Sequence, residues 1–123
     1  MAQILVVDDS STVRNEVGGF LQRSGLSVAY AVDGKDGLSK LAADPSVKLV
    51  VCDVNMPNMD GLTMAEKVRS ELRNSAVNIV MLTTENAPAM KERGKAAGIK
   101  GWIVKPFNGL SVLATFKKLA GAA

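Results

Sequence analysis

Short apolar runs recur along the chain at intervals long enough to hold a helix. The runs are three or four residues long and rich in β-branched side chains: Ile4–Val7, Val28–Ala31, Leu49–Cys52, residues 79–82 and residues 102–104. Continuous apolar runs of this length are typical of strands buried on both faces. They therefore predict a parallel sheet.

The segments between these runs carry apolar residues at helical spacing. Ser10 or Ser11 could cap the start of the first helix, Gly25 is placed to end it, and Asp60 is a possible cap for the third. The apolar positions are Val13, Val17, Phe20 and Leu21; Leu38, Leu41 and Ala42; Leu62, Ala65, Val68 and Leu72; and Leu110, Leu113, Ala114 and Phe116. Five strands then alternate with five helices, which predicts an α/β fold with a doubly wound parallel sheet.

The helix expected over residues 86–97 has the weakest pattern. Met90 is its only large apolar residue, and Gly94 lies inside it at a cost of about 1 kcal/mol relative to alanine. This stretch is either a poorly anchored surface helix without a role or a mobile functional element.

Composition narrows the class of protein. The chain has 123 residues, of which 47% are hydrophobic and 22% charged, which fits one compact domain over residues 1–123. The net charge is +3, but the basic residues are scattered and no aromatic residues interleave with them, which argues against binding to nucleic acid. No apolar stretch approaches the roughly 18 residues of a membrane span, and no basic leader precedes the first strand, so we expect no membrane insertion and a cytoplasmic location.

Two residue counts restrict the chemistry. The single cysteine, Cys52, lies inside an apolar run, which predicts a small core residue in a reducing compartment. Histidine is absent from the sequence, which removes the usual general base and the usual ligand of transition metals.

Charged residues follow three of the predicted strands at the point where each strand ends. Asp8 and Asp9 follow the first strand, Asp53 the third and Lys105 the fifth. The carboxyl ends of parallel strands share one edge of a sheet, where open α/β sheets place their ligands. Two like charges roughly 4 Å apart repel by about 4 kcal/mol at an effective dielectric constant near 20, so three carboxylates there favour a divalent cation. Oxygen ligands without histidine or cysteine suit Mg²⁺.

Two further features lie at this edge. Thr83 follows the fourth apolar run, and its hydroxyl could donate a hydrogen bond to an anion. The Lys105–Pro106 bond is a candidate cis peptide that would aim the lysine side chain.

Four segments together resemble one family. They are residues 6–10 (VVDDS), 52–61 (CDVNMPNMDG), 82–85 (LTTE) and 101–107 (GWIVKPF). With them the chain resembles the receiver domains of two-component response regulators, and among these the stand-alone chemotaxis regulators of the CheY type. The resemblance runs from Ile4 to about Leu119 and implies a flavodoxin-like sheet with the strand order 2-1-3-4-5.

The resemblance implies a role for each site residue. Asp53 is the phosphoacceptor, which takes a phosphoryl group from a phosphohistidine. Thr83 and Lys105 contact the phosphoryl oxygens, together with the backbone amides of Asn55 and Thr84. The implied cofactor is Mg²⁺ or Mn²⁺, which Asp9, Asp53 and the carbonyl of Asn55 hold directly and Asp8 holds through water.

The resemblance also implies how the signal is passed on and reset. Thr83 moves toward the phosphoryl group, and an aromatic residue on the last strand follows; here that residue is Trp102, where tyrosine or phenylalanine is more usual. Thr84 stands where a smaller residue often follows the switch threonine. Asn55 and Glu85 influence how fast the acyl phosphate is removed.

The implied partners are proteins. They are a CheA-like histidine kinase, a target such as a flagellar motor switch protein, and a phosphatase. The implied protein is a monomeric switch that catalyses its own phosphorylation and dephosphorylation and is not a turnover enzyme. A phosphorelay shuttle or a phosphate sink would need the same site.

Two alternatives from other classes use the same fold. A Mg²⁺-dependent phosphatase or phosphotransferase with Asp53 as nucleophile would need a general acid and a substrate cap, for which the chain has no long insertion. A flavodoxin-like electron carrier would bind a flavin phosphate after the first strand, where Asp8 and Asp9 would repel it.

Overall fold

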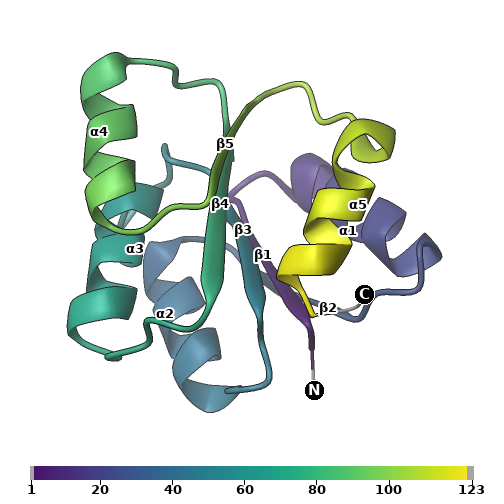
Figure 1. Ribbon diagram of the computed structural model, residues 1–123, viewed down its shortest axis with the longest axis horizontal. Helices are drawn as coiled ribbons and strands as arrows, with labels where there is room; N and C mark the ends of the chain where they lie inside the picture. Colours follow the sequence, from purple (N-terminus) through teal and green to yellow (C-terminus); the bar gives the residue numbers. More distant parts are fainter. Residues whose placement is uncertain (1, 122–123) are drawn as a thin grey trace.

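Five parallel strands form a single sheet at the centre of the molecule, and a helix follows each strand in the chain (Figure 1). This computed structural model describes residues 2–121. The strands are β1 (Ile4–Val7), β2 (Val28–Ala31), β3 (Leu49–Cys52), β4 (Asn78–Thr83) and β5 (Gly101–Val104). The helices are α1 (Ser11–Arg23), α2 (Gly34–Ala43), α3 (Gly61–Ser70), α4 (Pro88–Ala96) and α5 (Gly109–Leu119).

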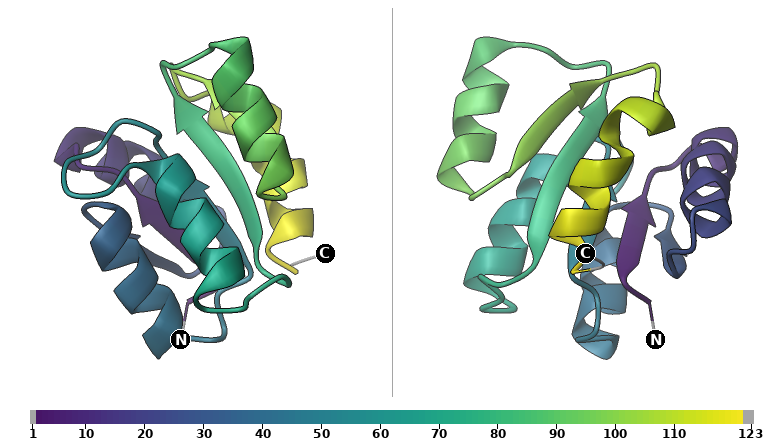
Figure 2. Two further views of the ribbon diagram at one scale, coloured as in Figure 1. Left: turned by 90° about the vertical axis from the view of Figure 1, so that its left-hand side faces the viewer. Right: turned by 45° about the vertical axis from the view of Figure 1, so that its right-hand side comes forward.

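The strand order is β2-β1-β3-β4-β5, with every neighbouring pair parallel, so the predicted order is confirmed. Helices α1 and α5 cover one face of the sheet, and α2, α3 and α4 cover the other (Figures 1 and 2). Over residues 2–121, none of the helices combines the length and the apolar character that crossing a bilayer requires.

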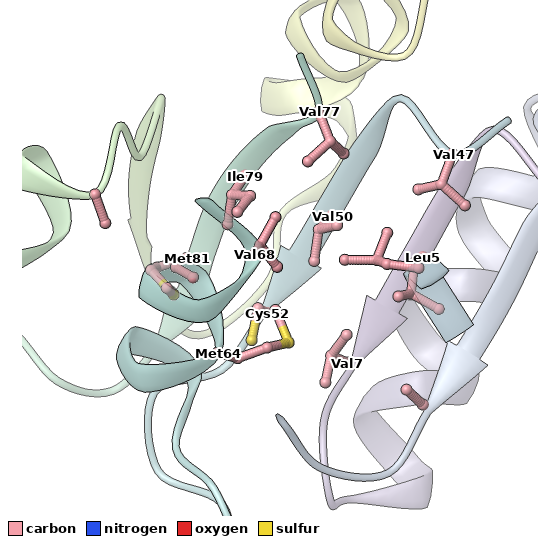
Figure 3. Packing of buried hydrophobic residues seen from close by; sticks show 14 of the residues in the cluster. Leu5, Val7, Val47, Val50, Cys52, Met64, Val68, Val77, Ile79 and Met81 are labelled. Carbon is pink, nitrogen blue, oxygen red and sulfur yellow. The ribbon is translucent and has the colours of Figure 1, made fainter. Parts of the chain in front are cut away.

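The sheet separates two hydrophobic cores, because successive side chains of a strand point to opposite faces. In β1, Leu5 and Val7 point toward α2 and α3, whereas Ile4 and Val6 point toward α1 and α5. Figure 3 shows the first of these cores. Burial on both faces explains why β1, β3 and β4 read as unbroken apolar runs. The edge strands β2 and β5 differ from the prediction, because most of their residues are only half-buried.

Side chains in the loops before three helices determine where these helices begin. Ser10, Asp33 and Asp60 each accept a hydrogen bond from a backbone amide in the first turn of α1, α2 and α3 respectively. The predicted caps Ser10 and Asp60 are therefore confirmed. Gly25 follows the end of α1 with a φ of 89°, a conformation that glycine adopts at no steric cost.

The structure corrects four details of the predicted helices. Ala42 of α2, predicted on the apolar face of that helix, is exposed. Helix α3 ends at Ser70, so Leu72 packs against the core from the following loop. Helix α4 begins at Pro88, two residues later than expected. The apolar face predicted for α5 is wrong at two positions, because Leu110 is 84% exposed and Ala114 is exposed as well; Val112, Leu113 and Phe116 make contacts with the core.

Candidate phosphoacceptor and metal site

The sheet register brings Asp8, Asp53 and Lys105 together. Val7 at the end of β1 pairs with Cys52 at the end of β3, so the aspartates that follow them lie side by side. Lys105 follows β5, and its backbone amide donates to the carbonyl of Thr83 at 2.9 Å, which continues the β4–β5 pairing by one step. The prediction that these strand ends share an edge of the sheet is confirmed.

Lys105 makes two ion pairs across this edge. Its Nζ lies 3.1 Å from Oδ2 of Asp8 and 3.0 Å from Oδ2 of Asp53. Burial lowers the pKa of Lys105, but hydrogen bonds to Asp53 and Asp8 outweigh that effect and hold the pKa above its usual value. Lys105 is therefore a fixed positive charge at neutral pH.

Asp8 is held in an environment that opposes its charge. The residue is 2% exposed, and burial raises the pKa of its carboxyl group, although the backbone amide of Ser10 and the ammonium of Lys105 act in the opposite direction. The Ser10 amide donates to Oδ1 of Asp8 at 2.9 Å, and Arg14 donates from Nη1 to the Asp8 carbonyl at 2.6 Å. No sequence motif indicated the contact of Arg14.

The acidic cluster, formed by Asp8, Asp9 and Asp53, has the chemistry of a site for a hard cation. One carboxylate oxygen from each residue lies within 4.8 Å of the others, and Asp9 is exposed to solvent. The backbone amide of Val54 donates to Oδ1 of Asp53 at 2.7 Å, which orients this carboxylate. An all-oxygen donor set that includes an exposed carboxylate suits Mg²⁺, which keeps several of its waters. The cluster therefore fits the divalent cation that the sequence predicts.

Thr83 lies at the end of β4 but does not donate to the acidic cluster. Its side chain is fully buried, and Oγ1 accepts a hydrogen bond from the backbone amide of Glu85 at 3.2 Å. Thr84, the next residue, is exposed. The structure thus places Thr83 at the predicted edge of the sheet and shows it bonded to the loop between β4 and α4.

Glu85 connects two other predicted site residues, a link that sequence reasoning missed. Its Oε1 accepts a hydrogen bond from Nδ2 of Asn55 at 2.8 Å, and its backbone carbonyl accepts one from Nε1 of Trp102 at 2.8 Å. Trp102 is half-buried and packs against the core beside α4. The three residues come from different loops and strands, so no local pattern could have shown that they touch.

Two more predictions concern residues beside the site. Cys52 is fully buried, so the prediction of a core residue is confirmed, and burial raises the pKa of its thiol well above the usual value. The Lys105–Pro106 peptide bond is cis. After it, Phe107 packs edge-on against Phe20 of α1, with ring centroids 5.8 Å apart.

Comparison with known proteins agrees with this geometry. The family model for the response regulator receiver domain matches residues 4–117. The chemotaxis protein CheY1 of Helicobacter pylori is 42% identical over 107 residues, which cover 86% of each chain. The CheY homologue of Campylobacter jejuni is 40% identical over 107 residues, which cover 86% of this chain and 82% of that one. The structure of the Vibrio cholerae chemotaxis protein CheY4 superimposes with a TM-score of 0.87 at 40% identity, and the match covers 97% of this chain and 98% of that one.

The chain therefore belongs to the family of response regulator receiver domains, and within it to the CheY-like members. It is a phosphorylation-activated response regulator of chemotaxis signalling, and a signalling protein rather than a turnover enzyme on external substrates.

Proposed function

We propose that Asp53 accepts the phosphoryl group from a phosphohistidine of a CheA-like histidine kinase. One Asp53 carboxylate oxygen would attack phosphorus, the bond from phosphorus to the donor imidazole nitrogen would break, and the product would be an acyl phosphate. The observation that carries the proposal is the position of this carboxylate: its side chain is 11% exposed, oriented by the Val54 amide, and 3.0 Å from the Lys105 ammonium. The absence of histidine from the sequence agrees with a donor on another molecule.

The acidic cluster would hold Mg²⁺, or Mn²⁺ in its place. Asp9, Asp53 and the backbone carbonyl of Asn55 would be direct ligands, and Asp8, the most buried of the three acids, would act through water. The ion would offset the charge of the phosphoryl oxygens and hold the group in line for transfer. A cation is also what the charge of the cluster requires, because Lys105 offsets only one of three carboxylates.

Lys105, Thr83 and the backbone amides of Asn55 and Thr84 would contact the phosphoryl oxygens. Phosphorylation adds up to about two negative charges at pH 7. The ammonium of Lys105 would then exchange part of its contact with Asp8 and Asp53 for a phosphoryl oxygen. The Thr83 hydroxyl accepts from the Glu85 amide and keeps its O–H free to donate to a phosphoryl oxygen. Because this side chain is fully buried, it would have to move toward the site, and the loop after β4 that it holds would move with it.

Asn55 and Glu85 would set how fast water removes the phosphoryl group. Their side chains are joined at 2.8 Å on the exposed side of the site. Two polar side chains that are open to solvent in this way could orient the water that attacks the acyl phosphate.

The protein would act in the cytoplasm as a monomer made of one receiver domain over residues 1–123. Its partners would be the kinase, a target such as a flagellar motor switch protein, and a phosphatase that resets the signal. A role as phosphorelay shuttle or phosphate sink would use the same chemistry. Binding experiments separate the chemotaxis role from the shuttle role. The chemotaxis role requires that beryllofluoride with Mg²⁺ increases binding to purified motor switch protein, whereas a shuttle would bind a histidine-containing phosphotransfer protein instead.

The phosphoacceptor is tested with a radiolabelled low-molecular-weight phosphodonor and Mg²⁺. We expect the wild-type protein to take up label, and Asp53→Asn to take up none. Glu71→Gln is the control, because Glu71 is an exposed carboxylate just after the last turn of α3, at the edge of the sheet opposite the acidic cluster, and pairs with Lys67. Uptake that persists in Asp53→Asn, or no uptake by the wild type under saturating Mg²⁺, would contradict the proposal.

A further inference from the structure

The loop from β3 to α3, residues 53–60, is tied to the neighbouring loop between β2 and α2. Nδ2 of Asn58 donates a hydrogen bond to Oδ2 of Asp33 at 2.7 Å. The backbone amide of Gly34 donates to the carbonyl of Met59 at 3.1 Å. Asn58 has a φ of 67°, a left-handed conformation that asparagine tolerates better than most residues. The loop is thus fastened at its outer turn by both side-chain and backbone contacts.

Both carboxylate oxygens of Asp33 accept hydrogen bonds, one from the first turn of α2 and one from the loop between β3 and α3. Oδ1 accepts the amide of Asp36 at 2.8 Å and caps α2, while Oδ2 accepts the amide nitrogen of Asn58. The residue is 8% exposed, and the hydrogen bonds from the Asp36 amide and from Asn58 hold the pKa of its carboxyl group below the usual range. The cap therefore places an ionised acceptor where it can hold the neighbouring loop.

The backbone approach between the two loops leaves little room for adjustment. A side chain at position 34 would place its Cβ 2.6 Å from the Met59 carbonyl oxygen, so only glycine permits this contact. At the inner end of the loop, the Val54 amide donates to Asp53, and the Val54 carbonyl accepts the Gly61 amide at 2.8 Å. Asn55 lies between these two fastened ends.

We propose that Asp33 and Asn58 are positioning residues for the metal site: their hydrogen bond fixes the loop so that the backbone carbonyl of Asn55 faces the cation. This inference rests on the proposed metal site and goes beyond it, because neither residue would touch the ion or the phosphoryl group. A loop that is already ordered loses less conformational entropy when its carbonyl becomes a ligand. Residues behind the direct ligands commonly alter metal affinity by about 10-fold or more when replaced.

Three variants separate the hydrogen bond from the backbone conformation and from charge. Asn58→Gly permits the left-handed backbone but removes the side-chain amide. Asn58→Asp faces Asp33 with a second carboxylate. The double variant Asp33→Asn with Asn58→Asp reverses donor and acceptor: the new asparagine can still cap α2 through its oxygen and donate through its nitrogen. Ser75→Asp is the charge control, because it adds one carboxylate in the exposed loop before β4, at the opposite edge of the sheet.

For each variant we would measure the dissociation constant for Mg²⁺ by calorimetry and that for Mn²⁺ by electron paramagnetic resonance. The melting temperature without metal is measured in parallel. We expect Asn58→Gly and Asn58→Asp to weaken binding by about 10-fold, and the double variant to return to within about 3-fold of wild type, as Ser75→Asp does. The added negative charge of Asn58→Asp would by itself favour the cation, so a loss there cannot be attributed to charge.

The melting temperatures separate positioning from general stabilisation. If all variants melt at similar temperatures but only the double variant regains metal affinity, the hydrogen bond acts on the metal site and not on overall stability. Wild-type affinity in Asn58→Gly would overturn the inference, as would a double variant that melts like wild type but binds as weakly as Asn58→Asp. Failure of the proposed function looks different: the wild-type protein itself would then bind neither ion.

Discussion

At the level of single residues, Lys105 offsets the mutual repulsion of Asp8 and Asp53. It contacts both carboxylates at about 3 Å, and these side chains are only 3% and 11% exposed. Removal of one partner from a buried ion pair leaves an uncompensated charge. We expect Lys105→Ala to lower the free energy of unfolding by about 3 kcal/mol in the absence of metal, the lower end of the range for buried pairs, because the lysine side chain is 20% exposed. The measurement is urea denaturation with a chelator present.

Addition of Mg²⁺ should recover much of the stability lost in Lys105→Ala, because the cation would take over the neutralising role of the lysine. The exposed Lys100→Ala serves as control and should change stability by less than about 0.5 kcal/mol. If Lys105→Ala were as stable as wild type without metal, the ion pairs would contribute nothing net.

Asp8 shows the opposite balance, because the fold disfavours its charged form. A carboxyl group whose pKa is raised in the folded protein binds its proton more tightly there, so its contribution to stability is largest at acid pH and falls as pH rises through the folded pKa. Asp8→Asn keeps an acceptor for the Ser10 amide and removes the charge. We expect a melting temperature a few degrees higher than wild type at neutral pH without metal, with the difference shrinking as the pH is lowered.

The same substitution should remove most of the stabilisation that Mg²⁺ gives to the wild-type protein. Thermal unfolding at several pH values, with and without Mg²⁺, measures both effects in one series. A melting temperature below wild type at neutral pH would show that the charge of Asp8 is stabilising despite its burial.

At the scale of the elements, helix α4 is anchored at one end. Arg69 of α3 donates to the carbonyls of Ala97 and Gly98 at 3.0 and 3.3 Å, just beyond the last turn of α4. Gly94 is buried, and a Cβ there would lie 3.3 Å from both Ile99 and Trp102. The glycine that weakens the helix pattern therefore allows close packing. At the start of the helix, Ala87 gives no side-chain cap.

This asymmetry predicts that α4 opens from its first turn, where a cap can be supplied. Ala87 has the extended backbone of a capping residue, with φ and ψ of −69° and 134°. We expect Ala87→Asp to stabilise the helix by about 1 kcal/mol and to slow hydrogen exchange at residues 90–92. Ala87→Val, which cannot cap, is the control. Equal exchange in both variants would mean that the first turn is already held by other contacts.

The elements also show what the sequence could predict and why. The strands, the caps Ser10 and Asp60 and the acidic cluster were predictable, because each depends on a short run of residues and on the rule that parallel strands end at one edge. The core face of α5 was not, because Leu110 matches the period but the docking of the helix leaves it exposed. The contacts of Glu85 with Asn55 and Trp102 join residues 30 and 17 positions apart, so they depend on tertiary structure alone.

At the scale of the whole molecule, the strand order explains why the positively charged residue of the site has a long side chain. Strand β5 is separated from β3 by β4, and strands lie about 4.8 Å apart, so Lys105 has to reach roughly 10 Å across the sheet edge. Strand β4 ends in the small side chain of Thr83 at this point. A movement of Lys105 toward a phosphoryl group, as proposed above, would therefore take place beside the end of β4, where the Thr83 hydroxyl holds the next loop.

Trp102 can report this movement, because it is the only tryptophan of the chain and bonds to the same loop. We expect its fluorescence to change when beryllofluoride and Mg²⁺ occupy the site: if Thr83 moves toward the site with the Glu85 amide that it holds, the Glu85 carbonyl that accepts the indole N–H shifts as well. Asp53→Asn should give no change, since it lacks the carboxylate that beryllofluoride requires. Fluorine magnetic resonance establishes occupancy independently. A flat signal at full occupancy would mean that the site and the α4–β5 surface are uncoupled, and that any target must read the phosphoryl group from the site itself.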